Sequence, residues 1–275
     1  ARLARCESVF WNIRGTMPAS ELKATLILPI IGALSHIIPN KIICCGNEAA
    51  KYHAAKGYCV KRLVLIPNGY LFAGEPQITS MIKLMQDKHK KNIQQEITIL
   101  SVARFDRLKD HQNLINAFAL FCRAHNARLV MVGAGVTEDN VSLQRYVTEA
   151  KVPPTQITFV GELAGLSELN TYYDQADVFC LSSLSEGFPN VLFEAMARGC
   201  KIVSTDVGDA REVFGELVTF CEPSNSDALA EALISAKHKK ITVAHQERCG
   251  DLLRRFSLSE MTKKYEAVYY KSYSQ

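Results

Sequence analysis

The sequence predicts an α/β fold with parallel sheets, and three observations support this prediction. Short apolar runs of strand length alternate with segments of helical pattern along most of the chain. Several apolar runs end in turns rich in glycine or serine, as buried strands do where they leave the carboxyl edge of a parallel sheet. The 275 residues, 48% of them hydrophobic, can bury the core of one large domain or of two smaller ones. We expect one complete doubly wound, Rossmann-like domain, preceded by a partial α/β domain.

The first part of the chain supplies too few elements for a complete doubly wound sheet. Asn47 can cap a short helix that Gly57 ends. The turn 67–69 then breaks the pattern, and the lysine-rich stretch up to Gln95 has no strand periodicity. We therefore place a domain boundary at this turn. The expected strands before it are 8–13, 41–45 and 62–66, and the expected helices are 19–38 and 48–56.

The second part of the chain alternates regularly between strand-like and helix-like segments. This alternation is typical of a parallel sheet whose crossover helices cover both faces. The expected strands are 97–103, 128–132, 157–160, 178–181, 201–205 and 217–220. The expected helices are 111–125, 141–151, 167–175, 189–199, 227–236 and 257–270.

A turn between a strand and a helix in the stretch 177–209 is the first candidate for a ligand site. The apolar run 178–181 ends in a serine-rich break, and Pro189 suits the first position of the helix that follows. Unpaired amide groups and the dipole at a helix N-terminus attract anions, so this turn is expected to bind a phosphate. Two carboxylates bracket it, because Glu186 precedes the turn and Glu194 lies inside the helix.

Two cations follow the first strand of the second part. Arg104 and Lys109 would reach the same crevice as the Glu186 turn, because the carboxyl ends of parallel strands meet at one edge of a sheet. An arginine and a lysine that converge on one point suit a diphosphate. The alternative is a solvated loop whose charges have no role, and spacing alone does not decide between the two.

Three further features are weaker signals. Gly133 and Gly135 form a lone GxG after a strand, which is more often a tight turn than a dinucleotide-binding loop. Gly161 and Glu162 follow the next strand, where main-chain groups could contact a base. Glu194 could equally be a solvent-facing residue of its helix, since a buried and unpaired carboxylate is costly.

Composition and motifs argue against several classes of protein. The net charge of +4 comes from 32 basic and 28 acidic residues, a near balance that argues against a nucleic-acid-binding protein. The histidines show no HxH or HExxH spacing and the nine cysteines no CxxC pair, so we predict reduced thiols and no metal site. No GxSxG or Walker sequence is present, which argues against a hydrolase or a P-loop enzyme. The most apolar stretch, 26–34, is far shorter than the roughly 20 residues of a membrane-spanning helix.

Several motifs, taken in chain order, resemble glycosyltransferase family 4, whose members are retaining enzymes of the glycosyltransferase-B fold. VARFDRLKDHQNLINAF resembles the family's Arg/Lys segment, ITFVGE its base-binding loop, and EGFPNVLFEAMARG its E-x7-E motif. VSTDVGDAREVF and FSLSEMTKKYEAVY resemble the segments that follow, and PNG at 67–69 resembles the interdomain linker. WNIRG and KIICCGNEAAKYHAAKGY resemble the later part of the acceptor domain in bacterial surface-polysaccharide members. The motifs cover nearly all of residues 61–270.

This resemblance implies roles for the candidate residues. It assigns Arg104 and Lys109 to the donor diphosphate, Glu186 to the transferred sugar and Glu194 to the ribose. Cations and helix-terminal amides would stabilise the charge that grows on the leaving diphosphate, so no metal and no other cofactor is expected. The residues predicted to be catalytic are Arg104, Lys109 and Glu186. The predicted donor-binding residues are Gly133, Gly135, Gly161, Glu162, Gly187, Phe188, Pro189, Asn190, Val191 and Glu194.

The resemblance also implies a division of the chain. A complete acceptor domain of this fold has its own doubly wound sheet, and the first residues of the chain match only its later part. We therefore expect a fragment or an N-terminally truncated product. Its expected parts are a partial acceptor-side domain with linker at 1–69, a donor-binding domain at 70–256, and a C-terminal helix at 257–275 that packs back toward the N-terminal part.

The resulting hypothesis is a glycosyltransferase of bacterial cell-surface polysaccharide synthesis. It would move a sugar from a nucleotide diphosphate sugar, UDP-linked in preference to GDP-linked, to a glycan or lipid-linked acceptor. One alternative is a nucleotide-sugar-binding module without transfer activity, and another is an epimerase, for which we find no acid–base pair. We expect a cytoplasmic protein. For the apolar helix 19–38 we favour packing within the acceptor domain over shallow contact with the inner face of the cytoplasmic membrane.

Overall fold

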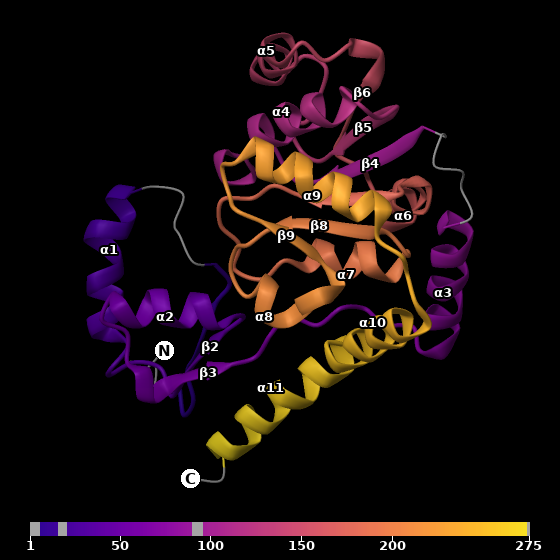
Figure 1. The fold of residues 1–275 in the computed structure, drawn as a ribbon. Coiled ribbons are helices and arrows are strands. Elements are labelled where there is room, and N and C mark those ends of the chain that lie inside the picture. The colour runs from indigo at the N-terminus through magenta and orange to yellow at the C-terminus, as the bar shows by residue number, and fades with distance from the viewer. Residues whose placement is uncertain (1–5, 16–20, 90–95, 274–275) are drawn as a thin grey trace.

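The computed structural model describes residues 6–15, 21–89 and 96–273, which form two parallel β-sheets (Figure 1). The smaller sheet has the strand order β1-β2-β3, and the larger one the order β6-β5-β4-β7-β8-β9. The second order is that of a doubly wound sheet whose direction of winding reverses between β4 and β7. The smaller sheet comprises β1 (Phe10–Ile13), β2 (Lys41–Cys44) and β3 (Leu63–Leu65). The larger sheet comprises β4 (Ile97–Val102), β5 (Ala127–Val132), β6 (Ile157–Gly161), β7 (Val178–Leu181), β8 (Lys201–Thr205) and β9 (Thr219–Cys221).

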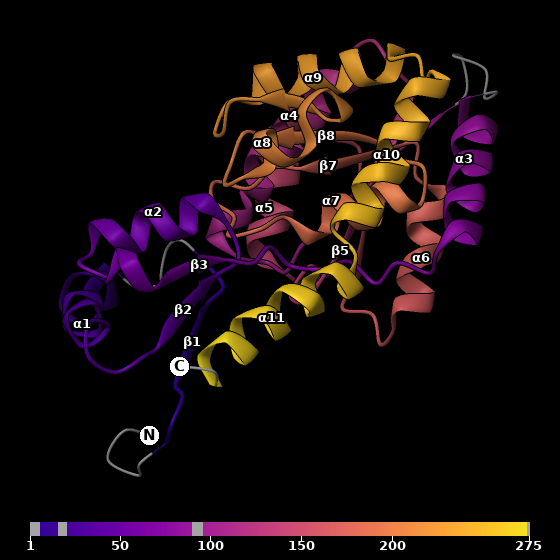
Figure 2. The same ribbon diagram turned by 90° about the horizontal axis from the view of Figure 1, so that it is seen from below.

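Helices cover both faces of the larger sheet, as the α/β prediction requires. Successive strand residues point to opposite faces, so Leu100 and Phe179 belong to one apolar cluster while Ile99 and Val178 belong to another. Figure 2 shows α7 and α9 on opposite sides of β7 and β8. The first face is covered by α3 (Glu75–His89), α6 (Leu166–Gln175), α7 (Asn190–Ala197), α8 (Ala210–Phe214) and α10 (Val243–Arg255). The second face is covered by α4 (His111–Cys122), α5 (Val141–Ala150) and α9 (Ser226–His238).

The smaller sheet has its own apolar cluster. Ile42 and Cys44 of β2 pack together with Ala49 from one helix and with Leu28 and Ile31 from another. These helices are α2 (Asn47–Ala55) and α1 (Glu21–Leu34). Among the described residues, no helix combines the length and the apolar composition that a membrane span requires.

Two of the longer helices among the described residues have no counterpart in the sequence prediction, and neither has the five-residue α8. The lysine-rich stretch before residue 95 contains α3, whose Ile78, Met81 and Met85 are buried against the larger sheet. These three residues are spaced as i, i+3 and i+7, which is the pattern of one helical face. The stretch indeed has no strand periodicity, but its helical pattern was not predicted. The second such helix is α10, which buries Cys249 and Leu252 against the same cluster.

The C-terminal helix α11 (Leu258–Tyr273) runs from the larger sheet to the smaller one (Figure 1). The ring of Tyr269 lies edge-on to that of Phe10, with centroids 4.7 Å apart. The hydroxyl of Tyr265 donates to Asn12 Oδ1 at 2.9 Å and accepts a hydrogen bond from Arg14 at 3.0 Å. The last helix thus connects the end of the chain to β1.

One side chain of the larger unit caps a helix of the smaller one. Asp209, which is buried, accepts hydrogen bonds from the backbone amides of Asn47 and Glu48. The predicted capping role of Asn47 is therefore wrong, because its side chain makes no cap and instead donates to Glu212. A carboxylate at a helix N-terminus satisfies the unpaired amides and complements the dipole. Asp209 thereby fixes α2 to the loop that follows β8.

Candidate functional site

The carboxyl ends of β4 and β7 lie side by side, and they bring one predicted cation and one predicted carboxylate together. Lys109 Nζ lies 2.6 Å from Glu186 Oε1, and the two side chains are only 18% and 12% exposed. Ser183 donates a second hydrogen bond to the same oxygen at 2.6 Å. An ion pair held this far from water is a strong local interaction. The pair lies at the topological switch point, where the direction of winding reverses between β4 and β7. Open α/β sheets bind ligands at such switch points.

Main-chain contacts lock the two loops that carry this pair. Ser182 donates to the carbonyl oxygen of Lys109 at 2.8 Å, and the amide of Leu184 donates to the carbonyl oxygen of Leu108 at 2.8 Å. Asp106 accepts from the amide of Leu108 at 2.8 Å. This amide, together with the nearby Arg104, holds the pKa of the Asp106 carboxyl below its usual value. The loop after β4 is therefore fixed before any ligand binds.

Arg104 lies on the same loop but does not contact Glu186. Its guanidinium donates to Asp106 Oδ2 at 3.1 Å, and its side chain is 64% exposed. The carbonyl oxygen of Arg104 lies 3.1 Å from Nε2 of His111, whose ring stacks on Phe105. The backbone of Arg104 is thus anchored while its charged end remains exposed to solvent. Both predicted cations are paired with a carboxylate, so an anionic ligand would have to compete with Asp106 and Glu186.

The turn 187–189 leads into α7 as predicted, and it lies against the smaller sheet. A Cβ atom on Gly187 would come within 2.6 Å of the carbonyl oxygen of Arg14, so only glycine fits there. Phe188, a predicted donor-binding residue, has its side chain buried in the core, where its ring stacks on Phe193. Pro189 is buried as well. Contact of these residues with a ligand would therefore have to go through the main chain.

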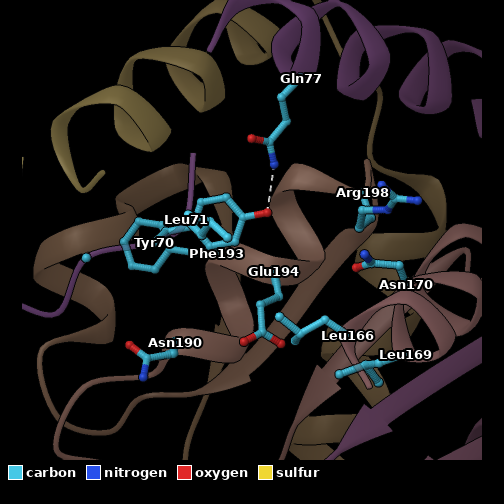
Figure 3. A pocket seen from close by; sticks show the side chains of 11 residues that line it. Tyr70, Leu71, Gln77, Leu166, Leu169, Asn170, Asn190, Phe193, Glu194 and Arg198 are labelled. Atoms are coloured by element: carbon cyan, nitrogen blue, oxygen red, sulfur yellow. Dashed lines mark hydrogen bonds between the residues drawn. The ribbon is translucent and has the colours of Figure 1, made fainter. Parts of the chain in front are cut away.

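A pocket of ≈ 320 Å³ lies along one face of α7, between α6, α3 and the linker that follows β3 (Figure 3). This volume lies at the lower end of the range of about 300–1,000 Å³ that is usual for small-molecule pockets. Two predicted donor-binding residues, Asn190 and Glu194, are part of its wall. The other wall residues are Gly69, Tyr70, Leu71, Gln77, Leu166, Leu169, Asn170, Phe193 and Arg198.

Glu194 is a half-buried residue of this pocket rather than a solvent-facing helical residue. Its Oε2 accepts a hydrogen bond from the hydroxyl of Tyr173 at 2.9 Å. Burial raises the pKa of the Glu194 carboxyl, and the hydrogen bond from Tyr173 opposes this shift. The interpretation as an exposed surface charge is therefore wrong.

The glycine loops after β5 and β6 have structural reasons for their composition. Gly133 has φ +148, and a Cβ atom there would lie 2.2 Å from the carbonyl oxygen of Ala103. The amide of Gly133 donates to the carbonyl of Gly161 at 2.8 Å, so the loops are tied to each other. Gly135 also has a positive φ, and Glu162 is exposed. The tight-turn interpretation thus accounts for the glycines, and their main-chain groups lie at the same sheet edge as Lys109.

The chain was compared with models of protein families, and one model matches more than half of it. The description of this model is "Glycosyl transferases group 1", and the match runs over residues 85–254, from the end of α3 to α10. The chain belongs to this family. The switch-point ion pair, the turn before α7 and the pocket wall from Leu166 to Arg198 all lie inside the matched region.

Curated relatives of this chain include proteins from bacteria. One is the putative teichuronic acid biosynthesis glycosyltransferase TuaC of Bacillus subtilis, 30% identical over 42% of this chain and 26% of its own length. Another is an N-acetylgalactosaminyltransferase of Campylobacter jejuni that acts on a diphospho-undecaprenol, 33% identical over 49% of this chain and 36% of its own length. The chain therefore spans less than half the length of each of these relatives.

Solved structures share the fold of the chain along nearly its whole length. HepE of Anabaena, crystallised with UDP-glucose, has a TM-score of 0.78 and 18% identity over 98% of this chain and 74% of its own. Sucrose-phosphate synthase of Thermosynechococcus elongatus has a TM-score of 0.73 and 21% identity over 96% of this chain and 68% of its own. The chain thus has the glycosyltransferase-B type of α/β fold, as predicted.

The structure adds residues that sequence reasoning about this family member missed. Tyr70 and Gln77 come from the linker and from α3, and Leu166 and Asn170 come from α6. The missed signal was the helical spacing of Ile78, Met81 and Met85. These residues pack α3 against the same cluster as α7, so that α3 and the linker before it form part of the pocket wall. All nine cysteines are free, and burial raises the pKa of Cys44 and of Cys249 to about 12. Within the described part of the chain, no cluster of His, Cys, Asp and Glu side chains could hold a metal ion.

Proposed function

We propose that the chain acts as a retaining glycosyltransferase of family 4. It transfers a sugar from a UDP-linked donor to a glycan or lipid-linked acceptor in the synthesis of a cell-surface polysaccharide. The observation that carries this proposal is the Lys109–Glu186 pair at the switch point, directly before the N-terminus of α7. This point combines a cation, a carboxylate and helix-terminal amides. Such a combination suits a ligand that contains a sugar joined to a diphosphate.

The chemistry follows from the charges at this point. In a retaining transfer the bond between C1 of the sugar and the diphosphate oxygen breaks, and its electron pair stays on the diphosphate. The acceptor oxygen bonds to C1 on the same face, and its proton passes to the leaving oxygen. Lys109, Arg104 and the amides that precede α7 stabilise the negative charge, which is larger in the transition state than in the bound donor. Glu186 orients Lys109 and contacts the sugar.

The bound ligands and the names of similar proteins support the proposed UDP-linked donor and the proposed role in polysaccharide synthesis. HepE was crystallised with UDP, with UDP and glucose, and with UDP-glucose, which favours a UDP-linked donor over a GDP-linked one. Relatives are named for the biosynthesis of teichuronic acid, capsular polysaccharide and O-antigen, and one acts on a diphospho-undecaprenol. In this proposal the donor nucleoside lies in the pocket along α7, with Glu194 at its ribose.

The proposal is tested by titrating the purified chain with UDP and with GDP in a calorimeter. We expect UDP to bind more tightly, and Glu194→Ala to raise the Kd for UDP about tenfold, as for loss of a hydrogen bond to a charged group. Glu168→Ala, which removes an exposed carboxylate of α6, is the matched control and keeps the Kd. Absence of UDP binding by the unaltered chain would refute the donor assignment.

A nucleotide-sugar-binding module is the second candidate function, because the smaller sheet has only three described strands. Both candidates bind UDP, but only a transferase releases UDP from UDP-sugars in the presence of undecaprenyl-linked acceptors. We expect this release to persist in EDTA, since cations of the chain stabilise the leaving group. UDP binding without any release would favour the binding module.

A further inference from the structure

The hydrogen bond between Tyr173 and Glu194 connects a core residue to the pocket. Tyr173 lies on α6 and is 1% exposed, and its ring packs against Phe179 in the core. Its hydroxyl donates to Oε2 of Glu194, a residue of the pocket wall, at 2.9 Å. A fully buried tyrosine hydroxyl that ends on a carboxylate is a fixed donor, because the packed ring cannot turn away.

The two carboxylate oxygens of Glu194 have different surroundings. Oε2 is held by Tyr173, whereas Oε1 has no hydrogen-bonding partner within the ranges that the structure describes. The carboxylate lies in the pocket between Asn190 and Leu166 in the view of Figure 3. One oxygen is thus fixed, and the other is available to a ligand.

The neighbouring polar groups do not substitute for Tyr173. Arg198, which caps the C-terminus of α7, pairs with both carboxylate oxygens of Asp174 through Nε and Nη2 of its guanidinium. Tyr70 faces the pocket from the linker, where its hydroxyl accepts a hydrogen bond from Gln77 at 2.7 Å (Figure 3), and it is Tyr173 rather than Tyr70 that donates to Glu194. The hydroxyl of Tyr173 is therefore the group, among the described residues, that offsets the cost of burying the charge of Glu194.

We propose that Tyr173 is a positioning residue for nucleotide binding. It holds one oxygen of Glu194 so that the other accepts a hydrogen bond from a ribose hydroxyl of the donor nucleotide. This inference rests on the proposed function, because it takes the pocket along α7 as the nucleoside site. It adds that recognition of the ribose depends on a residue that does not touch the nucleotide.

Removing only the hydroxyl isolates this role from packing. Tyr173→Phe keeps the ring in the core. Tyr172→Phe on the same helix is the matched control, since Tyr172 packs against the same cluster and the hydroxyl that donates to Glu194 is that of Tyr173. We expect the Kd for UDP to rise about tenfold in Tyr173→Phe and to stay unchanged in Tyr172→Phe.

Two readouts separate positioning from a general structural effect. The first is the ratio of the Kd for 2′-deoxy-UDP or 3′-deoxy-UDP to that for UDP, which we expect to fall in Tyr173→Phe because the carboxylate is no longer aimed at the ribose. The second is pH. Loss of the hydroxyl raises the pKa of Glu194 further, so the carboxylate is protonated earlier as the pH falls. The affinity for UDP therefore begins to decline at a higher pH in the variant than in the unaltered chain.

The outcomes are distinct from those that test the proposed function. If the unaltered chain does not bind UDP, the proposed function fails. If it binds UDP, and Tyr173→Phe has the same Kd, the same deoxy-nucleotide ratio and the same pH profile, only the positioning role of Tyr173 is overturned. A Tyr173→Phe variant that binds more weakly but keeps both the ratio and the pH profile also contradicts the role, because it shows a structural effect alone.

Discussion

Replacing Lys109 by methionine should separate the stability of the switch point from its chemistry. Lys109 Nζ and Glu186 Oε1 are 2.6 Å apart, and their side chains are 18% and 12% exposed. With an effective dielectric constant of about 20, their attraction is about 6 kcal/mol before desolvation is counted. Removing one partner of a buried pair costs about 3–5 kcal/mol, because the remaining charge is left unpaired. We expect the lower end, about 3 kcal/mol, since Ser183 still donates to Glu186.

The double variant Lys109→Met with Glu186→Gln removes the unpaired charge as well. We expect it to regain about 2 kcal/mol of the free energy of unfolding that Lys109→Met loses, because an amide is far cheaper to bury than a lone carboxylate. It should not regain activity, since Lys109, one of the two cations assigned to the leaving diphosphate, is still missing. The release of UDP from a UDP-sugar should fall about 100- to 1,000-fold in both variants, as for loss of one electrostatic contact in a transition state.

Urea unfolding followed by circular dichroism measures the stability, and a coupled assay for UDP measures turnover. Arg107→Met removes an exposed cation from the same short turn, Arg107–Lys109, and should leave both quantities unchanged. Equal free energies of unfolding in the unaltered chain and in Lys109→Met would show that the pair does not stabilise the fold, and equal values in the single and double variants would show that the unpaired carboxylate has no cost. Turnover at the unaltered rate in Lys109→Met would refute the role of Lys109 in the reaction.

Three further predictions concern other parts of the structure. Gly133→Ala should lower the free energy of unfolding by about 3 kcal/mol, because φ is +148 and the new Cβ lies 2.2 Å from a carbonyl oxygen; Gly165→Ala, with open space around it, is the control in the same urea assay. Asp209→Ala should cost about 1–2 kcal/mol and speed amide exchange at the start of α2, which loses its cap; unchanged exchange there would contradict the capping role. Burial lowers the pKa of His53 and of His111, so the unfolded chain binds more protons than the native one as the pH drops below about 6.5, and the free energy of unfolding should fall between pH 7 and pH 5. A His111→Gln variant should show a shallower fall, and an equal slope would rule out a contribution from His111.

The arrangement of strands could be predicted from the sequence because parallel strands have a simple signal. Runs such as 97–103 and 178–181 are almost wholly apolar, and in the structure both lie in the interior of the larger sheet. Their common carboxyl edge then implied that Lys109 and Glu186 would meet, although 77 positions separate them. The helix α3 was missed because its exposed face is rich in charge, which hid the spacing of Ile78, Met81 and Met85.

The details of the site depend on contacts that no local pattern encodes. Arg104 pairs with Asp106, because a carboxylate two residues away lies within reach of its guanidinium. The side chain of Phe188 is buried in the core, where its ring packs against the rings of Phe193 and Phe256. The contact between Phe188 and Phe256 joins segments that are distant in the chain, and the sequence alone offers no measure of such packing.

The central claim is that a nucleotide diphosphate sugar binds where β4 and β7 diverge, with its nucleoside in the pocket along α7. Hydrogen–deuterium exchange of the purified chain with and without saturating UDP tests this claim most directly. We predict slower exchange at 104–109, at 166–173 and at 186–194, and little change in β1, β2 and β3. Unchanged exchange in those three segments, or protection confined to the smaller sheet, would contradict the claim.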